Sequence, residues 1–388
     1  MKFKLKSQTL LVTAILALFM LSGVIGCAGS EPAAPAEVKI GVIAPLTGEK
    51  AAIGQATIEA AELAAKEVND AGGLQVGDQK VKVVVVVEDD KDQEAAAVAA
   101  ARKLINQDNV VALTGLHISR NAIPVGEIAE SSQIPMVSGK STNPKTTEGR
   151  DYVFRVAFLD PFQGQVLAGF SQNELGVSKA AVLYDEASAY NKGIAEVYKQ
   201  SFEEAGGEVV AFESYVSGQE DFLDQLTAIK DSGAEVLFLP NYFHEVPDQV
   251  TQARELGITV PVIGSDSWGI LQSEDLPLVE GSYFTSHFAA DSDSEVSQKF
   301  VAAYEEEYGK TPVDAAAATY DAVGMILQAM SNQGKTDPAS IREGIATMGG
   351  YPGVTGDIEY QGSGDPVKSA VIMKVEDGAF KFYGYAAP

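Results

Sequence analysis

A lysine stands among small polar residues in the stretch SGKSTNPK, residues 138–145, directly after an apolar run. Its Gly-Lys-Ser triplet matches the end of the P-loop that binds nucleotide phosphates. A P-loop also has a glycine five positions before the Gly-Lys pair, and Ile134 occupies that position here. Pro144 stands where the helix of a P-loop would already be running. The sequence therefore argues against nucleotide binding, and another ligand must explain these polar groups.

Hydroxyl groups gather at two predicted strand ends. Ser119 stands where a predicted helix begins, and Ser141 and Thr142 follow the next predicted strand. Hydroxyls together with free backbone N–H groups at a helix start can bind a carboxylate. Ordinary helix capping explains Ser119 alone equally well, but two such positions at adjacent strand ends favour a ligand.

Two carboxylates stand at the ends of other predicted strands. Asp160 closes YVFRVAFLD, and Asp266 closes PVIGSD. Asp160 alone is most simply a helix N-cap, because Pro161 follows it. Facing the hydroxyls across a cleft, however, the two carboxylates suit a ligand that carries an ammonium beside a carboxylate. That description fits an α-amino acid.

Signatures of catalysis are weak. The histidines His117, His244 and His287 lack the spacing of a metal site, and no G-x-S-x-G nucleophile motif is present. Asp160 and Asp266 could in principle be the acid/base pair of a two-lobed sugar hydrolase. Such enzymes usually also have aromatic side chains that stack on the sugar, whereas this chain has one tryptophan. We therefore predict a protein that is not an enzyme and uses no cofactor or metal. His117 is as consistent with loop packing as with ligand contact.

The N-terminus has the pattern of a bacterial lipoprotein signal. Three lysines within the first six residues precede a short apolar run at 10–21, which suits a secretory signal and is too short to span a bilayer. The sequence Val-Ile-Gly-Cys then resembles a lipobox, and its Cys27 is the single cysteine of the chain. We predict a signal peptide at 1–26, a lipid anchor on Cys27 and a tether at 27–37. The mature protein is thus expected on the periplasmic or cell-surface side of a bacterial membrane.

The chain is strongly acidic, with 54 Asp and Glu against 28 Lys and Arg and a formal net charge of −26. Removal of the signal lysines makes this charge more negative. Such a charge repels nucleic acid and anionic lipid, so no nucleic-acid partner is expected. Its main effect is expected to be solubility.

Short β-rich runs alternate with helical patterns from residue 38 onward, and this alternation occurs in two series. A strand–helix alternation predicts a doubly wound α/β lobe with a mainly parallel sheet, so two series predict two lobes. Ligands of such sheets bind at the carboxyl ends of the strands, where the polar residues above stand. The predicted strands are 38–46, 81–89, 110–115, 134–139 and 152–158 in the first series, and 179–185, 208–215, 235–240 and 261–266 in the second.

In order and spacing, several stretches of the chain resemble the leucine/isoleucine/valine-binding protein family. These are type I periplasmic binding proteins that serve ABC importers of branched-chain amino acids. The resemblance extends over nearly all of Val38–Tyr385. It rests on IGVIAPLTGEKAAIG, ATIEAAELAAKEVNDAGGL, FRVAFLDPFQG, VLYDEASAYNKG, SGQEDF and ATYDAV.

The resemblance implies two lobes joined by a three-segment hinge. Lobe 1 is expected at 38–160 plus 288–362, and lobe 2 at 161–287 plus 363–388. The hinge segments are expected at 158–162, at 285–289 and near 360–364. It also implies a monomer that closes around an amino acid and delivers it to the permease subunits of an ABC transporter.

The resemblance further implies a role for each candidate residue. The ligand carboxylate is expected in the first lobe, its ammonium between two aspartates, and its side chain against two tyrosines. Those groups are Ser119, Lys140, Ser141 and Thr142 for the carboxylate, Asp160 and Asp266 for the ammonium, and Tyr190 and Tyr242 for the walls.

Two positions depart from the family pattern. Ile53 stands where an aromatic residue is common, and Lys140 stands where a small residue is common. We expect the Lys140 side chain to point to solvent while its backbone contacts the ligand. In the alternative, its charge recognises an acidic or otherwise polar ligand.

Other ligands and roles remain open at this stage. Proteins of this fold also bind amides, urea-like compounds and aromatic acids, and some act as sensors. Asp160 and Asp266 argue against such ligands, because a neutral or anionic ligand would leave two carboxylates unpaired in a closed cleft, at a cost of several kcal/mol.

Overall fold

The computed structural model describes residues 36–387. The predicted signal peptide at 1–26, Cys27 and nearly all of the tether at 27–37 lie outside these residues. Between residues 36 and 387, no helix is both long enough and apolar enough to cross a membrane.

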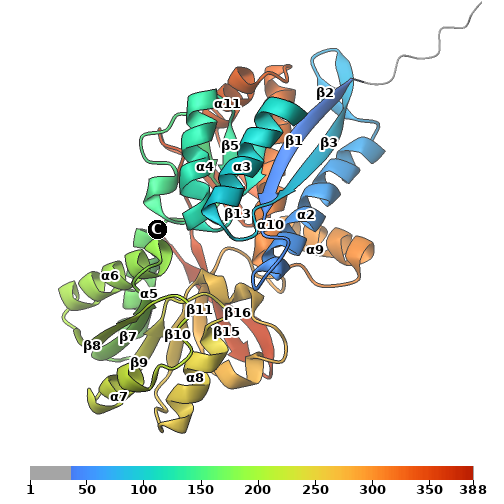
Figure 1. Cartoon of the computed structure of the whole chain (residues 1–388). Coiled ribbons are helices and arrows are strands. Elements are labelled where there is room, and N and C mark those ends of the chain that lie inside the picture. Colours follow the sequence, from blue (N-terminus) through green and yellow to red (C-terminus); the bar gives the residue numbers. More distant parts are fainter. Residues whose placement is uncertain (1–35, 388) are drawn as a thin grey trace, which may run out of the picture. The chain divides into compact units, whose positions relative to one another are not determined.

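The first sheet has six strands in the order β2-β3-β1-β4-β5-β6 (Figure 1). All neighbours pair in parallel except the β2–β3 hairpin. The β-branched run of β3 suits a strand, and its valines are buried or half-buried. The bounds are β1 (Glu37–Ala44), β2 (Leu74–Val76), β3 (Gln79–Asp89), β4 (Ala112–Gly115), β5 (Met136–Ser138) and β6 (Val153–Arg155).

Helices cover both faces of this sheet. Successive residues of a strand point to opposite faces, so Val42 of β1 belongs to the core under α2, α10 and α11, whereas Ile43 belongs to the core under α3 and α4. Helix α9 packs against α2. The bounds are α2 (Ala51–Asp70), α3 (Glu94–Lys103), α4 (Ser119–Ser132), α9 (Glu295–Tyr308), α10 (Asp314–Gln333) and α11 (Pro338–Ala346).

The second sheet has seven strands in the order β16-β15-β11-β10-β9-β7-β8. Strands β7 to β11 pair in parallel, and β15 and β16 add an antiparallel edge. The strands are β7 (Lys179–Asp185), β8 (Glu208–Tyr215), β9 (Val236–Leu239), β10 (Val262–Gly264), β11 (Tyr283–Ser286), β15 (Ala370–Glu376) and β16 (Ala379–Ala386). The accompanying helices are α5 (Asp160–Asn173), α6 (Ala189–Glu204), α7 (Leu223–Asp231) and α8 (Val246–Glu255).

Three chain segments connect the two sheets. The first leads from β6 to α5, and the second leads from β11 to α9. A third was expected near 360–364, but Gly364 O accepts a hydrogen bond from Arg155 N of β6. In addition, β14 (Pro366–Val367) pairs with β13 (Gly356–Tyr360), which pairs with β12 (Tyr351–Gly353). The chain therefore passes to the second sheet later than expected, between β14 and β15.

The predicted α/β fold with two mainly parallel sheets is confirmed. Strand β2 and helix α11 were not predicted. The predicted ends of two strands also lie too far along the chain. Strand β6 ends at Arg155, and Asp160 is the first residue of α5. Strand β10 ends at Gly264, and Asp266 is the first residue of a 3-10 turn. The assignment of residue ranges to lobes stays a prediction.

Candidate functional site

A small cavity lies where the carboxyl ends of strands from both sheets meet. Its volume is about 30 Å³, enough for one or two water molecules. Four of the predicted ligand-binding residues line it: Lys140, Tyr190, Tyr242 and Asp266. The lining is completed by Ile53, His117, Ile118, Ser267, Ile270 and Ala315.

The other four predicted residues are buried but do not line this cavity. Ser119, Ser141, Thr142 and Asp160 are each at most 2% exposed. Ser141 Oγ donates to Ser119 Oγ at 3.1 Å, so the loops after β4 and β5 do bring the predicted hydroxyls together. Ser141 Oγ also contacts Thr146 Oγ1 at 2.6 Å.

A tight backbone turn presents the residues after β4. Gly115 has φ +86, and a side chain there would meet the carbonyl oxygen of Ile43 at 2.3 Å. Leu116 follows with φ 51, a region that non-glycine residues rarely adopt. This turn directs His117 into the cavity wall and lets α4 begin at Ser119.

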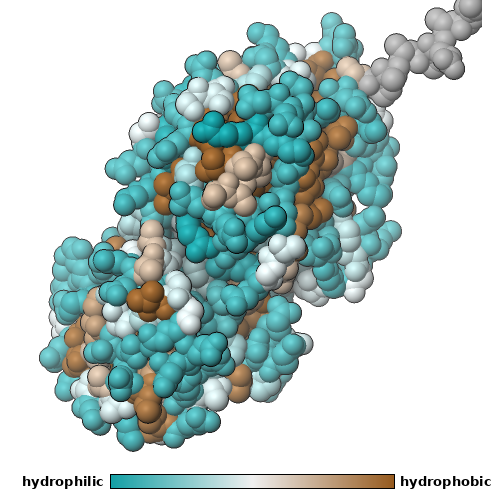
Figure 2. Space-filling model, viewed as in Figure 1, coloured by the Kyte–Doolittle hydropathy of each residue, from teal (hydrophilic) through white to brown (hydrophobic). Residues whose placement is uncertain are grey.

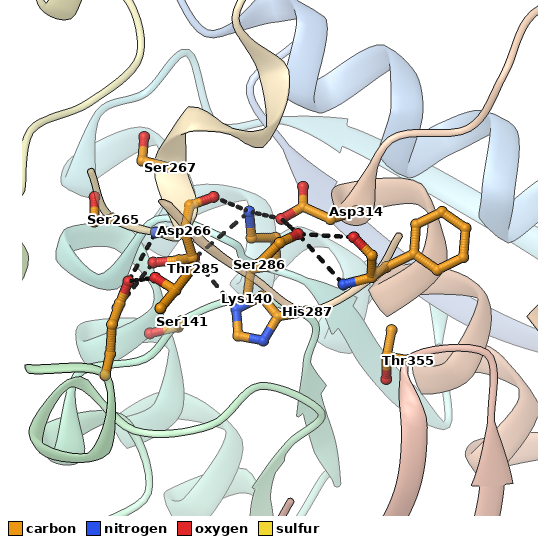
Figure 3. A network of polar contacts seen from close by, with 12 residues as sticks. Lys140, Ser141, Ser265, Asp266, Ser267, Thr285, Ser286, His287, Asp314 and Thr355 are labelled. Carbon is orange, nitrogen blue, oxygen red and sulfur yellow. Dashed lines mark hydrogen bonds and ion pairs between the residues drawn. The ribbon is translucent and has the colours of Figure 1, made fainter. Parts of the chain in front are cut away.

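The Lys140 side chain does not point to solvent, contrary to our expectation. It is 7% exposed and forms an ion pair with Asp314, 2.7 Å from Nζ to Oδ2. Nζ also donates to the Asp266 backbone oxygen at 3.1 Å and lies 3.5 Å from Asp266 Oδ2 (Figure 3). A buried ammonium needs such partners because desolvation penalises its charge. Here burial lowers the pKa of Lys140, but the two carboxylates more than offset it, and its pKa is raised.

Asp266 already has several partners within the protein. Its Oδ1 accepts from Tyr190 OH at 2.6 Å and from Gln163 Nε2 at 3.0 Å. Its Oδ2 lies 3.2 Å from His287 Nε2. Burial alone would raise the pKa of Asp266, but the Lys140 charge and these hydrogen bonds lower it below its usual value. Asp266 is therefore a carboxylate held in place by fixed donors.

Asp160 has the opposite environment. It is 1% exposed, and neither carboxylate oxygen has a hydrogen-bond partner among residues 36–387. Burial, together with the nearby Asp266 charge, raises its pKa to about 8, against the opposing effects of the neighbouring Thr142, Arg155 and Asn143 side chains. Thr142 Oγ1 also has no partner within the described part of the chain. The Asp160 backbone N–H donates to the Thr142 backbone carbonyl oxygen at 2.9 Å. The two residues that carry these unpartnered groups are therefore neighbours in space.

The walls of the cavity are largely apolar. Tyr190 and Tyr242 stack with ring centroids 5.1 Å apart, and Lys50 Nζ lies 4.1 Å from the centre of the Tyr242 ring. Ile53 lines the cavity from the first turn of α2. Both tyrosines line the cavity, and Ile53 supplies an aliphatic surface in place of an aromatic one.

Several residues of the site were not predicted. Asp314 is the first residue of α10, but no local signal marks it as the partner of Lys140, 174 positions away. His287 contacts Asp266, although the scattered histidines gave no pattern. His117 Nε2 lies 3.0 Å from Thr319 Oγ1, and burial lowers its pKa to about 3. Ser267 and Ile270 follow Asp266 in the same 3-10 turn.

A wider cleft of about 530 Å³ adjoins the small cavity, since Tyr242 and Ile118 line both. Its rim is charged. Asp92 forms ion pairs with Lys50 and Arg120, each at 2.8 Å. Among residues 36–387, no three His, Cys, Asp or Glu side chains gather in a way that could hold a metal ion.

The sequence profile of the periplasmic binding protein family matches residues 37–379. The chain therefore belongs to the periplasmic binding protein family, as the resemblance indicated. It is 30% identical to an "Amino acid binding protein" of Pseudomonas aeruginosa over 92% of this chain and 94% of that one. It is also 30% identical to "Leu/Ile/Val-binding protein homolog 3" of Brucella melitensis, over 90% and 94%.

Solved structures agree with this assignment. The leucine-binding protein LivK of Thermotoga maritima superposes with a TM-score of 0.83 at 31% identity, over 90% of this chain and 99% of that one. LivJ of Streptococcus pneumoniae in complex with isoleucine gives 0.83 at 30% identity, over 91% and 100%. A solute-binding protein of R. palustris in complex with benzoate gives 0.79 at 22% identity, over 91% and 97%, and shares the fold.

Proposed function

We propose that this chain is an extracytoplasmic solute-binding lipoprotein of an ABC importer. It binds an α-amino acid, branched-chain or otherwise aliphatic, between its two lobes and delivers it to the membrane permease. A lipid on Cys27 anchors it to a bacterial membrane. Membership of the periplasmic binding protein family supports binding without catalysis.

The observation that best supports an amino acid as the ligand is the environment of Asp160. A carboxyl group that is 1% exposed and has no hydrogen-bond partner among the described residues is costly to ionise. A ligand ammonium would supply the missing counter-charge, and the neighbouring Thr142 hydroxyl is free to bind a polar group of the same ligand. The two groups together suit a molecule in which an ammonium and a carboxylate are neighbours.

The lining of the cavity favours an aliphatic side chain. Ile53, Ile118, Ile270 and Ala315 provide methyl groups, and Tyr242 closes the wall. The relatives named for amino acids or for leucine, isoleucine and valine support the same ligand class.

One observation favours a second candidate, a ligand without an ammonium group. Asp266 already has the Lys140 ammonium nearby and accepts hydrogen bonds from Tyr190 and Gln163. A ligand ammonium is therefore not needed there. An amide, a urea-like compound or an aromatic acid would satisfy this half of the site, but it would leave Asp160 unpaired.

A ligand screen separates the two candidates. Purified protein that begins after Cys27 is heated with amino acids, amides and aromatic acids, and the midpoint of unfolding is recorded. A ligand that binds only the folded state raises this midpoint. Leucine, isoleucine or valine should give the largest rise. A larger rise with an amide or an aromatic acid would favour the second candidate.

A further inference from the structure

A second cavity, of about 350 Å³, lies among the segments that connect the two sheets. We call it the hinge pocket. None of the eight predicted ligand-binding residues lines it. Its walls come from the β11–α9 connection, the start of α9, the turn between β12 and β13, and the β14–β15 connection. The polar lining includes His287, Ser292, Ser294, Thr355, Lys368 and Ser369.

Lys368 is an under-partnered cation in this pocket. It is 5% exposed, and its Nζ donates to Thr355 Oγ1 at 2.7 Å. Within the described part of the chain, that hydroxyl is its one hydrogen-bond acceptor, and no carboxylate lies within 4.0 Å of it. The nearby Asp321 is occupied by Thr355 and by the backbone N–H of Val354. An ammonium has three N–H donors, so two of them lack a partner.

His287, which lines the same pocket, carries an acceptor that lacks a partner. Its Nε2 faces the Asp266 carboxylate, which only accepts hydrogen bonds, so the ring hydrogen belongs on Nε2. Burial lowers the pKa of His287, which keeps the ring neutral. Its Nδ1 is then an acceptor, and it is buried without a partner among residues 36–387.

The start of α9 contributes further donors. Ser294 caps this 14-residue helix by accepting from Ser297 N, and both serines line the pocket. The first N–H groups of a helix have no partner within it and favour negative charge. Asp357 also lines the pocket, but it is exposed to solvent, which weakens its repulsion of an anion.

We propose that the hinge pocket binds a small oxyanion that carries a hydroxyl group, such as hydrogen phosphate. Lys368 supplies the counter-charge and donates to the anion oxygens. The hydroxyl of the anion donates to His287 Nδ1. Because two of the three segments that connect the sheets line the pocket, and His287 also contacts Asp266 of the candidate amino-acid site, an anion here would bind at the joint between the lobes.

Stability measurements with inorganic phosphate test this inference without any amino acid. The midpoint of thermal unfolding is followed against phosphate concentration, with sodium chloride keeping ionic strength constant. Phosphate should raise the midpoint saturably, and sulfate, which has no hydroxyl at neutral pH, should raise it less. Lys368→Met should weaken the apparent affinity at least about tenfold, because one charge-assisted hydrogen bond contributes that much or more. Lys368→Arg should retain most of it.

Lys192→Met, at an exposed position on α6, is the matched control and should respond as the parent does. A crystal of the parent protein soaked in arsenate, which keeps a hydroxyl at neutral pH as phosphate does, gives a readout that does not depend on how the variants fold. An anomalous peak beside Lys368 is expected. No peak there, or equal phosphate stabilisation of folded Lys368→Met and the parent, would overturn the proposal. Equal effects of sulfate and phosphate would contradict the role of His287.

Discussion

Lys140 and Asp314 form a buried ion pair between the loop after β5 and the first residue of α10, with 2.7 Å between Nζ and Oδ2. The same ammonium contacts Asp266 of the second sheet. Lys140 therefore links the two sheets at the candidate site. Figure 3 shows this link between the end of β5, the turn after β10 and the start of α10.

Removal of the Lys140 charge should destabilise the protein strongly. Lys140→Met leaves Asp314 without its counter-ion, and breaking a buried pair in this way costs about 3–5 kcal/mol. Urea denaturation followed by circular dichroism measures the loss. Lys192→Met removes an exposed pair with Glu196 and should cost no more than about 1 kcal/mol. Similar losses in the two variants would show that the Lys140 pair does not stabilise the fold.

Asp160→Asn should stabilise the unliganded protein, more so at higher pH. Folding raises the pKa of Asp160 from 3.8 to about 8, so the folded state holds this proton more tightly. The contribution of Asp160 is therefore favourable below about pH 4 and is lost as the pH rises towards 8. The amide does not titrate, so the gain in unfolding free energy should grow between pH 5 and pH 8.

The same variant should bind its amino acid at least about tenfold more weakly, because a neutral amide does not compensate an ammonium. Asp151→Asn is the control, since the Asp151 side chain is 83% exposed. A gain in stability that does not change with pH would contradict the buried, ionisable state of Asp160.

Ligand binding should bring the lobes together. The sheets are joined by three connecting segments, and a hinge of this kind permits closure around a ligand. A saturating amino acid should lower the radius of gyration in small-angle scattering. An unchanged scattering profile at saturation would argue against a moving two-lobe receptor.

Cys27→Ser should prevent lipidation and processing between Gly26 and Cys27. The thiol is the predicted attachment point, and the chain has no second cysteine to replace it. Labelling of cells with a radioactive fatty acid, followed by fractionation, tests this. A variant that is still labelled, processed and retained in the membrane would contradict the predicted anchor.

The elements of the fold were largely predictable because each strand carries its own signal. The apolar β-branched run in β3 and the short apolar runs in strands such as β4, β7 and β9 mark strands locally. Helix α11 was missed, because a nine-residue helix gives little periodicity. The third connection was placed too early, because the pairing of β14 with β13 depends on contacts that no local pattern reveals. The surface in Figure 2 is mostly hydrophilic, in keeping with the acidic composition.

The site was predictable only in part. A strand-end position pointed to Asp266, and the family resemblance pointed to Tyr190 and Tyr242; all three line one cavity. The prediction that the Lys140 side chain points to solvent was wrong, because its partner Asp314 belongs to a helix that is distant in the sequence. The contrast between the two aspartates depends entirely on tertiary contacts, since Asp266 has donors around it and Asp160 does not.

The central claim is that the ligand is an α-amino acid whose ammonium is compensated in the buried site. Isothermal titration calorimetry tests it most directly, by comparing leucine with 4-methylpentanoate, which has the same side chain and carboxylate but no ammonium. Leucine should bind at least about tenfold more tightly, because a charge-assisted hydrogen bond contributes about 1.5–3 kcal/mol. Equal or tighter binding of 4-methylpentanoate would contradict the claim.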